Sequence, residues 1–191
     1  MSDSLRQAAD RIRGRVEEQM KPGTVLIGIT DPKVAQYASY QEFGWVQRVT
    51  PKQHGWLGAH AGWDKAPKAG ASLVLPPRPF MHSTFLAKSR RWIQIAVNAP
   101  RVMGLYDTEK LLALVGAEAV SDIQMTIKSG GNEAMTFEER HPLTMAIYAQ
   151  RAQGHRTDGA GGISVKKPLT LTGRMAGAVH FDITDKLPEE D

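Results

Sequence analysis

The sequence contains no cysteine, which excludes disulfides, thiolate zinc sites and cysteine nucleophiles. This absence fits a protein made in a reducing cytoplasm. Long apolar runs are also missing, because none approaches the roughly 20 residues that span a bilayer. The N-terminus opens on a polar Ser-Asp-Ser segment in place of an apolar signal region. We therefore expect neither secretion nor insertion into a membrane.

A strong overall charge of either sign is absent as well. The 191 residues carry a formal net charge of +4, which is too small and too dispersed to identify a nucleic-acid reader. Local charge is more uneven. Lys88, Arg90 and Arg91 form a basic group, whereas five acidic residues lie in the last ten positions. Neighbouring copies of the chain could meet through these opposite signs.

The composition is that of an ordinary globular protein, with 41% hydrophobic and 23% charged residues. At this length one main core is expected, so we predict a single structural domain over residues 1–191. Apolar periodicity and turn residues predict the elements. In chain order they are a helix over 4–19, a strand over 24–29, a helical turn or edge strand over 34–43, a strand over 72–75, helices over 83–98, 108–128 and 142–152, and a strand over 179–184. The predicted fold class is α+β, with a small mixed or antiparallel sheet packed by several helices.

Two segments between these elements are predicted to lie outside the core. Residues 44–71 are rich in Gly, Pro, Lys, His and Trp, which is typical of a long protruding loop or a hairpin excursion. Residues 154–167 are rich in glycine and predict a flexible loop. Pro100 is expected to close the helix that precedes it.

Three segments, in the same order, resemble motifs of a diverse family of tailed-bacteriophage head-to-tail joining proteins. The first is Val25-Leu-Ile-Gly-Ile-Thr30 followed by Gln36-Tyr-Ala-Ser-Tyr-Gln-Glu-Phe-Gly44, which looks like the family's strand and its Tyr-Ala, Glu-Phe-Gly signature. The second, Leu75-Pro-Pro-Arg-Pro-Phe-Met81, is similar to a Pro-x-Arg-Pro-Phe element. The third, Lys167-Pro-Leu-Thr-Leu-Thr-Gly-Arg-Met175, is similar to a Pro-Leu-x-x-Thr-Gly segment, although Thr170 or Leu171 stands where an Asp is expected. The likeness covers residues 20–184.

This family comprises virion morphogenesis, neck, tail-completion and minor structural proteins. The resemblance implies a non-enzymatic virion protein of the head-to-tail junction, assembled in the bacterial host cytoplasm, that forms a ring joining or sealing head and tail. A hexamer is the favoured ring and a dodecamer the alternative, with other neck and tail proteins as partners. A tail terminator that caps the tail tube is the second interpretation. A DNA-binding accessory protein is the alternative from a different class.

The motifs and the tryptophans of residues 44–71 supply the candidate interface residues, because aromatic side chains and arginine dominate protein interfaces. They are Tyr37, Tyr40, Glu42, Phe43, Trp45, Trp56, Trp63, Arg78 and Phe80. The alternative is that these residues only determine the fold. Glu42 is a candidate partner for Arg78, and Phe80 could fill either its own core or a neighbour's surface. Lys88, Arg90 and Arg91 could face DNA in a ring lumen or simply solubilise a helix.

The sequence contains no motif that specifies a reaction. His54, His60 and Asp64 could ligate a metal ion, but their spacing matches no known ligand pattern, so we expect solvated loop residues. The run Glu138-Glu-Arg-His141 lacks the spacing of a catalytic constellation and is expected to be exposed charge before a helix. We therefore expect no catalytic residue, metal or cofactor, no membrane contact, and at most nonspecific contact with DNA.

Overall fold

The computed structural model describes residues 11, 14, 23–104, 107–147, 169 and 173–185. Its class is mixed helix and strand, which confirms the predicted one. The named elements are β1 (Thr24–Ile29), α2 (Pro32–Phe43), β2 (Trp45–Arg48), α3 (Pro51–Ala61), β3 (Ser72–Leu75), α4 (Phe80–Met103), α5 (Thr108–Ser129), α7 (Arg174–Gly177) and β4 (Val179–Thr184). Residues 142–147 are also helical. The helix predicted over 4–19 and the loop predicted over 154–167 lie outside the described residues, apart from residues 11 and 14, which are helical.

The described strands form two antiparallel sheets of two strands each, where the sequence predicts a single small sheet. One sheet pairs β1 with β4, and the other pairs β2 with β3. The contacts of the chain divide into two compact units. Unit 1 contains residues 1–28, 88–122 and 180–191, and unit 2 contains residues 29–87 and 123–179. The single structural domain over residues 1–191 stays a prediction.

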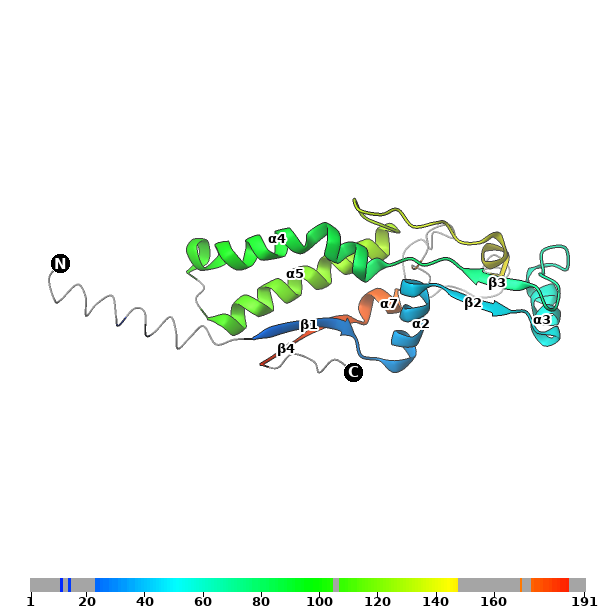
Figure 1. Cartoon of the computed structure of the whole chain (residues 1–191), viewed down its shortest axis with the longest axis horizontal. Helices are drawn as coiled ribbons and strands as arrows, with labels where there is room; N and C mark the ends of the chain where they lie inside the picture. The colour runs from blue at the N-terminus through cyan, green and yellow to red at the C-terminus, as the bar shows by residue number, and fades with distance from the viewer. Residues whose placement is uncertain are drawn as a thin grey trace. The chain divides into compact units, whose positions relative to one another are not determined.

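Unit 1 is layered, with α5 between α4 and the sheet of β1 and β4 (Figure 1). Trp92 of α4 is buried, and its indole N–H donates a 2.8 Å hydrogen bond to the carboxylate of Asp122 on α5. On the other side of α5, the ring of Phe181 lies so close to Gly116 that a Cβ on this glycine would come within 2.5 Å of it. The absence of a side chain at residue 116 therefore lets the strand and the helix approach.

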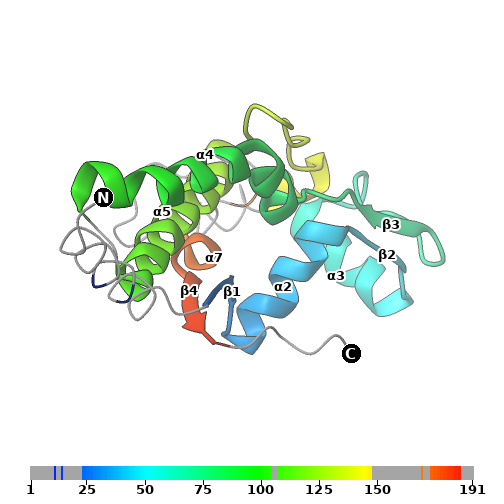
Figure 2. The ribbon, with the colours of Figure 1, turned by 60° about the vertical axis from the view of Figure 1, so that its left-hand side comes forward.

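Unit 2 contains residues 44–71, for which the sequence predicts a loop or a hairpin. These residues run along β2 and through α3, and the chain then returns along β3, which pairs with β2 from Trp45↔Leu75 to Arg48↔Ser72 (Figure 2). Thr50 and Gln53 form a capping box that starts α3. Leu57 and Ala61 are buried against Leu143, so the excursion has a small core of its own. Gly44, Pro51 and Gly62 mark the ends of elements, whereas Gly55 and Gly58 lie inside α3.

The helix predictions are largely confirmed. Residues 34–43, whose state the periodicity leaves open, belong to α2, which Asp31 caps by accepting the backbone amides of Lys33 and Val34. The prediction that Pro100 closes its helix is wrong, because α4 continues through it to Met103. A proline removes one hydrogen-bond donor, and the helix can continue beyond it when the later amides find their partners. Within the described residues, no helix combines the length and apolar character that crossing a membrane requires.

Candidate subunit interface

The first two motif segments form a joint at the start of α4. The carboxylate of Glu42, the next-to-last residue of α2, accepts hydrogen bonds from the backbone amides of Met81 and His82 at 3.0 and 2.9 Å. A carboxylate at this place satisfies amides that have no partner within the helix, and it interacts favourably with the positive end of the helix dipole. Glu42 therefore caps α4, and its predicted pairing with Arg78 is wrong.

Arg78 is buried, with 4% of its surface exposed. Its guanidinium donates to the side-chain oxygen of Gln41 and to the backbone carbonyls of Glu138 and Glu139, at 3.1, 3.1 and 3.2 Å. Burial lowers the pKa of this guanidinium from its ordinary value, while the charges of Tyr37 and Glu138 act in the opposite direction. Arginine still stays charged near neutral pH, so Arg78 is an internal cation that joins three segments of unit 2.

Phe80 is fully buried, which places it in the core of its own unit rather than on a neighbour's surface. One turn further along α4, the hydroxyls of Thr84 and Thr126 lie 2.8 Å apart, and the amide nitrogen of Asn132 donates to the hydroxyl of Ser83 at 3.1 Å. No motif in the sequence points to this buried polar network. Arg78 and Phe80 must therefore be removed from the predicted interface, because neither side chain reaches the surface.

Gly44 links α2 to β2 with φ 76° and ψ 174°, a conformation open essentially to glycine alone. A Cβ at this position would lie 2.9 Å from the carbonyl oxygen of Leu75 and 3.0 Å from the nitrogen of Pro77. The chain thus passes against the proline corner that follows β3. Glu42 and Gly44 therefore both stabilise the fold. Phe43, which lies between them, is exposed instead.

Phe43, the last residue of α2, has 81% of its surface exposed. Tyr37 and Tyr40 lie on the same helix and are 47% and 39% exposed. Tyr40 has contacts within the chain: its hydroxyl accepts a hydrogen bond from Gln36 at 3.2 Å, and its ring centre lies 5.8 Å from that of Trp45. Among the motif residues that the structure describes, Phe43 thus offers a largely exposed aromatic ring to a partner.

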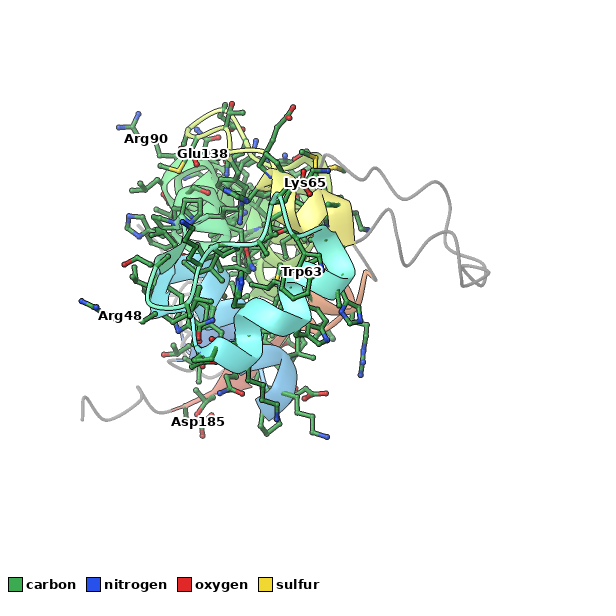
Figure 3. The ribbon with its side chains drawn as sticks, turned by 90° about the vertical axis from the view of Figure 1, so that its right-hand side faces the viewer. Arg48, Trp63, Lys65, Arg90, Glu138 and Asp185 are labelled. Carbon is green, nitrogen blue, oxygen red and sulfur yellow. The ribbon has the colours of Figure 1, made fainter. Side chains whose placement is uncertain are left out.

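The two exposed tryptophans of the excursion pack against imidazole rings. Trp56 stacks on His60 with ring centres 4.4 Å apart, and Trp63 meets His54 edge-on at 5.5 Å. The Nδ1 atoms of both histidines lie within hydrogen-bond distance of backbone carbonyls, at 2.9 Å for His54 and 2.8 Å for His60. The ring of Trp63 packs against Gly58 of α3, and 64% of the surface of Trp63 stays exposed (Figure 3).

His54, His60 and Asp64 are expected to be solvated loop residues, but both histidines lie on helix α3 and contact the tryptophans. Across the residues that the structure describes, no group of three or more His, Cys, Asp or Glu side chains is placed to hold a metal ion.

A cleft of about 570 Å³ lies beside the β2–β3 hairpin within unit 2. Its walls include Tyr37, Trp45, Leu73 and Leu143, and the run from Glu138 to His141 borders it. The backbone carbonyls of Glu138 and Glu139 hold Arg78, and the imidazole of His141 accepts the amide of Leu143 at 3.2 Å. These contacts give the charged run a structural role at the start of the helix over 142–147.

The three basic residues Lys88, Arg90 and Arg91 of α4 differ in their contacts. Arg91 pairs with Glu118 of α5, whereas Arg90 extends away from the protein (Figure 3). Lys88 is half-buried and also interacts within the chain. Whether these three residues face DNA or solubilise the helix stays a prediction.

Comparison with known proteins finds no family model that matches the chain, no similar curated protein and no similar solved structure. The resemblance to the phage joining proteins thus depends on the three motif segments and on how the fold uses them.

Proposed function

We propose that this chain is a non-enzymatic structural subunit of a tailed-bacteriophage virion. It forms a ring at the head-to-tail junction, where it joins or seals the head and the tail. The proposal starts from the three motif segments, which are separated by long stretches of sequence. One observation carries it further: described residues of all three segments meet at helix α2.

Residues of the motifs make direct contacts at this joint. Gln41 and Glu42 of the first segment bind Arg78 and Met81 of the second. The third segment is described at residues 169 and 173–175, and its Gly173 starts the short helix α7, which packs against α2. Residues that lie far apart in the chain and share one structural joint are the pattern expected of a fold signature, which supports the family resemblance.

The exposed residue of this joint provides the link to assembly. Glu42, Gly44, Arg78 and Phe80 are all used within the chain, whereas Phe43 lies among them with its ring in solvent. An exposed phenyl ring held on a rigid element is a typical anchor for a partner, since it loses little conformational freedom on binding. We therefore assign Phe43, supported by Tyr37 and Tyr40, to the contact between subunits or with an adjoining neck protein.

The location is tested by labelling the protein in virions and imaging them by negative stain. Label at the junction of head and tail is expected, and label confined to the capsid shell or the tail fibres would exclude the proposal. Binding to tail tubes made without heads would favour the tail terminator, and binding to filled heads without tails would favour the neck. Salt-sensitive binding of the purified protein to DNA, without ring formation, would favour the DNA-binding alternative.

The role of Phe43 is tested with the purified protein. Phe43→Ser should leave the melting temperature within about 3 °C of the unchanged protein, because an exposed side chain contributes little to stability. It should abolish rings in negative stain. Met125→Ser is the matched control, since Met125 is 64% exposed on α5, and rings should persist. Rings that survive Phe43→Ser would remove this residue from the contact.

A further inference from the structure

Helix α4 carries Lys88, Arg90, Arg91 and Arg101 and contains no acidic residue. Within unit 1, one of its faces is exposed and combines charge with apolar surface. Arg90, Ile93, Val97 and Arg101 follow one another at spacings of three, four and four residues, so they lie on one side of the helix. All four are exposed. We call these four residues the α4 outer face.

The opposite side of α4 explains why this face points outward. Trp92 and Ala99 are 7% and 5% exposed, and Trp92 bonds to Asp122 of α5. Positions 92 and 99 are seven residues apart and lie on a different side of the helix from Ile93 and Val97. The helix is therefore fixed by its inner side, while Ile93 and Val97 keep 62% and 56% of their surface in solvent.

The exposed side chains of Ile93 and Val97 favour a protein partner over DNA. A surface that contacts DNA gains its affinity from cations near phosphates and has no need of exposed isoleucine and valine between them. A face with apolar residues at helical spacing and arginines beside them instead suits a protein segment that is both apolar and acidic.

The same unit carries such a segment at the end of β4. Asp182 and Asp185 are exposed, and the sequence continues through Lys186 to Glu189, Glu190 and Asp191. Five acidic residues and one lysine thus occupy positions 182–191, with Ile183 and Leu187 between them. The carboxylate of Asp182 has a long contact of 3.6 Å to His180, which leaves most of its surface in solvent. We call residues 182–191 the acidic end.

The two surfaces of one copy do not face each other. Helix α5 lies between α4 and the sheet that contains β4, with Phe181 packed on its near side and Trp92 on its far side. Figure 3 shows the consequence: Arg90 lies at the upper edge of the view and Asp185 at the lower edge. Asp182 is held in its strand, so it reaches an α4 outer face only on another copy.

We propose that the α4 outer face of one subunit binds the acidic end of the next subunit. This inference rests on the proposed function, because it assumes that the subunits form a ring. It adds the two surfaces through which neighbouring subunits bind each other. The two surfaces differ, so the contact is head-to-tail, and such contacts generate either a closed ring or an open filament. The charges orient the subunits, while Ile93 and Val97 supply the apolar area that is buried.

The contact is tested by charge reversal in purified full-length protein. The first variant carries Arg90→Glu and Arg101→Glu, and the second carries Asp182→Lys, Asp185→Lys, Glu189→Lys and Glu190→Lys. Each variant alone places like charges across the contact, so its self-association should weaken by more than about tenfold. A control with Arg48→Glu and Lys52→Glu changes two exposed cations of unit 2 and should assemble as the unchanged protein does. Melting temperatures verify that all variants fold.

The decisive measurement is made on the mixture. In a one-to-one mixture, the reversed α4 face of the first variant meets the reversed acidic end of the second, and the unchanged surfaces also meet. Assembly should therefore return, with the two variants alternating around rings of even subunit number, which native mass spectrometry would detect.

Three results would overturn the proposal. They are full assembly of either variant alone, no assembly in the mixture, and loss of DNA binding by the first variant while its rings stay intact. These outcomes are separate from the virion labelling, so failure of this contact and failure of the proposed function are distinguishable.

Discussion

The guanidinium of Arg78 donates a 3.1 Å hydrogen bond to the side-chain oxygen of Gln41, and both residues are buried. The backbone repeats the connection, because the amide of Arg78 donates to the carbonyl of Gln41 at 2.6 Å. The last turn of α2 and the proline corner after β3 are thereby held together twice. Loss of the guanidinium would leave the buried side-chain oxygen of Gln41 without this donor, which costs more than the hydrogen bond itself contributes.

We predict that Arg78→Met lowers the free energy of unfolding by about 3 kcal/mol, since a buried side-chain oxygen and two carbonyls lose a charged donor. Arg78→Lys should recover only part of this loss, because an ammonium group cannot reproduce the planar arrangement of donors. Urea unfolding followed by circular dichroism measures both. Arg48→Met, at an exposed position of β2, is the control. A loss below about 1 kcal/mol for Arg78→Met would contradict the role assigned to Arg78.

A second prediction separates backbone strain from steric overlap at Gly44. Gly44→Ala should lower the free energy of unfolding by about 3 kcal/mol, because it combines an unfavourable φ with a methyl group pressed against Leu75 and Pro77. Gly70 also has a positive φ of 85°, but no atom lies within 4 Å of a Cβ built there. Gly70→Ala should therefore cost only about 1 kcal/mol. Equal losses in thermal unfolding would mean that the overlap at Gly44 relaxes freely.

The polar network around Asn132 gives a third prediction. Asn132→Ala should destabilise the protein by about 2 kcal/mol, because three hydrogen bonds are lost. The side-chain amide nitrogen of Asn132 donates to the hydroxyl of Ser83, and its side-chain oxygen accepts the backbone amides of Ala134 and Met135. A double-mutant cycle with Thr126→Val measures the coupling, because the Asn132 amide also lies 3.4 Å from the Thr126 hydroxyl. Additive losses in chemical unfolding would show that the two residues act independently.

Asp107 provides a prediction about pH. Its carboxylate accepts the backbone amide of Lys110 and also contacts the ammonium group of that residue, which lowers the pKa of Asp107 below its ordinary value of 3.8. A lowered folded pKa means that the stabilisation is present above pH 3.8 and is lost as the pH falls through the folded pKa. Asp107→Asn keeps a capping oxygen but cannot titrate.

The measurement compares the two proteins between pH 7 and pH 2. The stability advantage of the unchanged protein over Asp107→Asn should be constant down to about pH 4 and shrink below it. A difference that stays constant to pH 2 would show that the carboxylate charge contributes nothing at this helix start.

The sequence predicts the long elements well, because their signals are local. The stripe of apolar residues over 108–128 gives α5 nearly to the residue, and the alternation from Val179 to Thr184 gives β4. Pro100 shows the limit of a local rule, since a proline inside a helix removes one hydrogen bond but does not oblige the chain to leave the helix.

The candidate site is less predictable, because it depends on contacts across the chain. Glu42 and Arg78 are plausible partners by charge, yet Glu42 binds helix amides and Arg78 binds Gln41. Nothing local distinguishes Gln41 from other glutamines or announces that Asn132 completes a buried network. Phe43 and Phe80 both look like apolar motif residues, and only the fold places one in solvent and the other in the core.

The last three residues of α2 point to three destinations: Gln41 to a buried arginine, Glu42 to the first amides of α4, and Phe43 to the solvent. Successive residues of a helix are rotated by about 100°, so inserting or deleting one residue upstream in α2 would misdirect all three side chains together. The helix between Pro32 and Gly44 should thus tolerate substitutions but no change in length. Variation in length belongs instead in the exposed turn over 68–70, where extra residues would redirect no buried side chain.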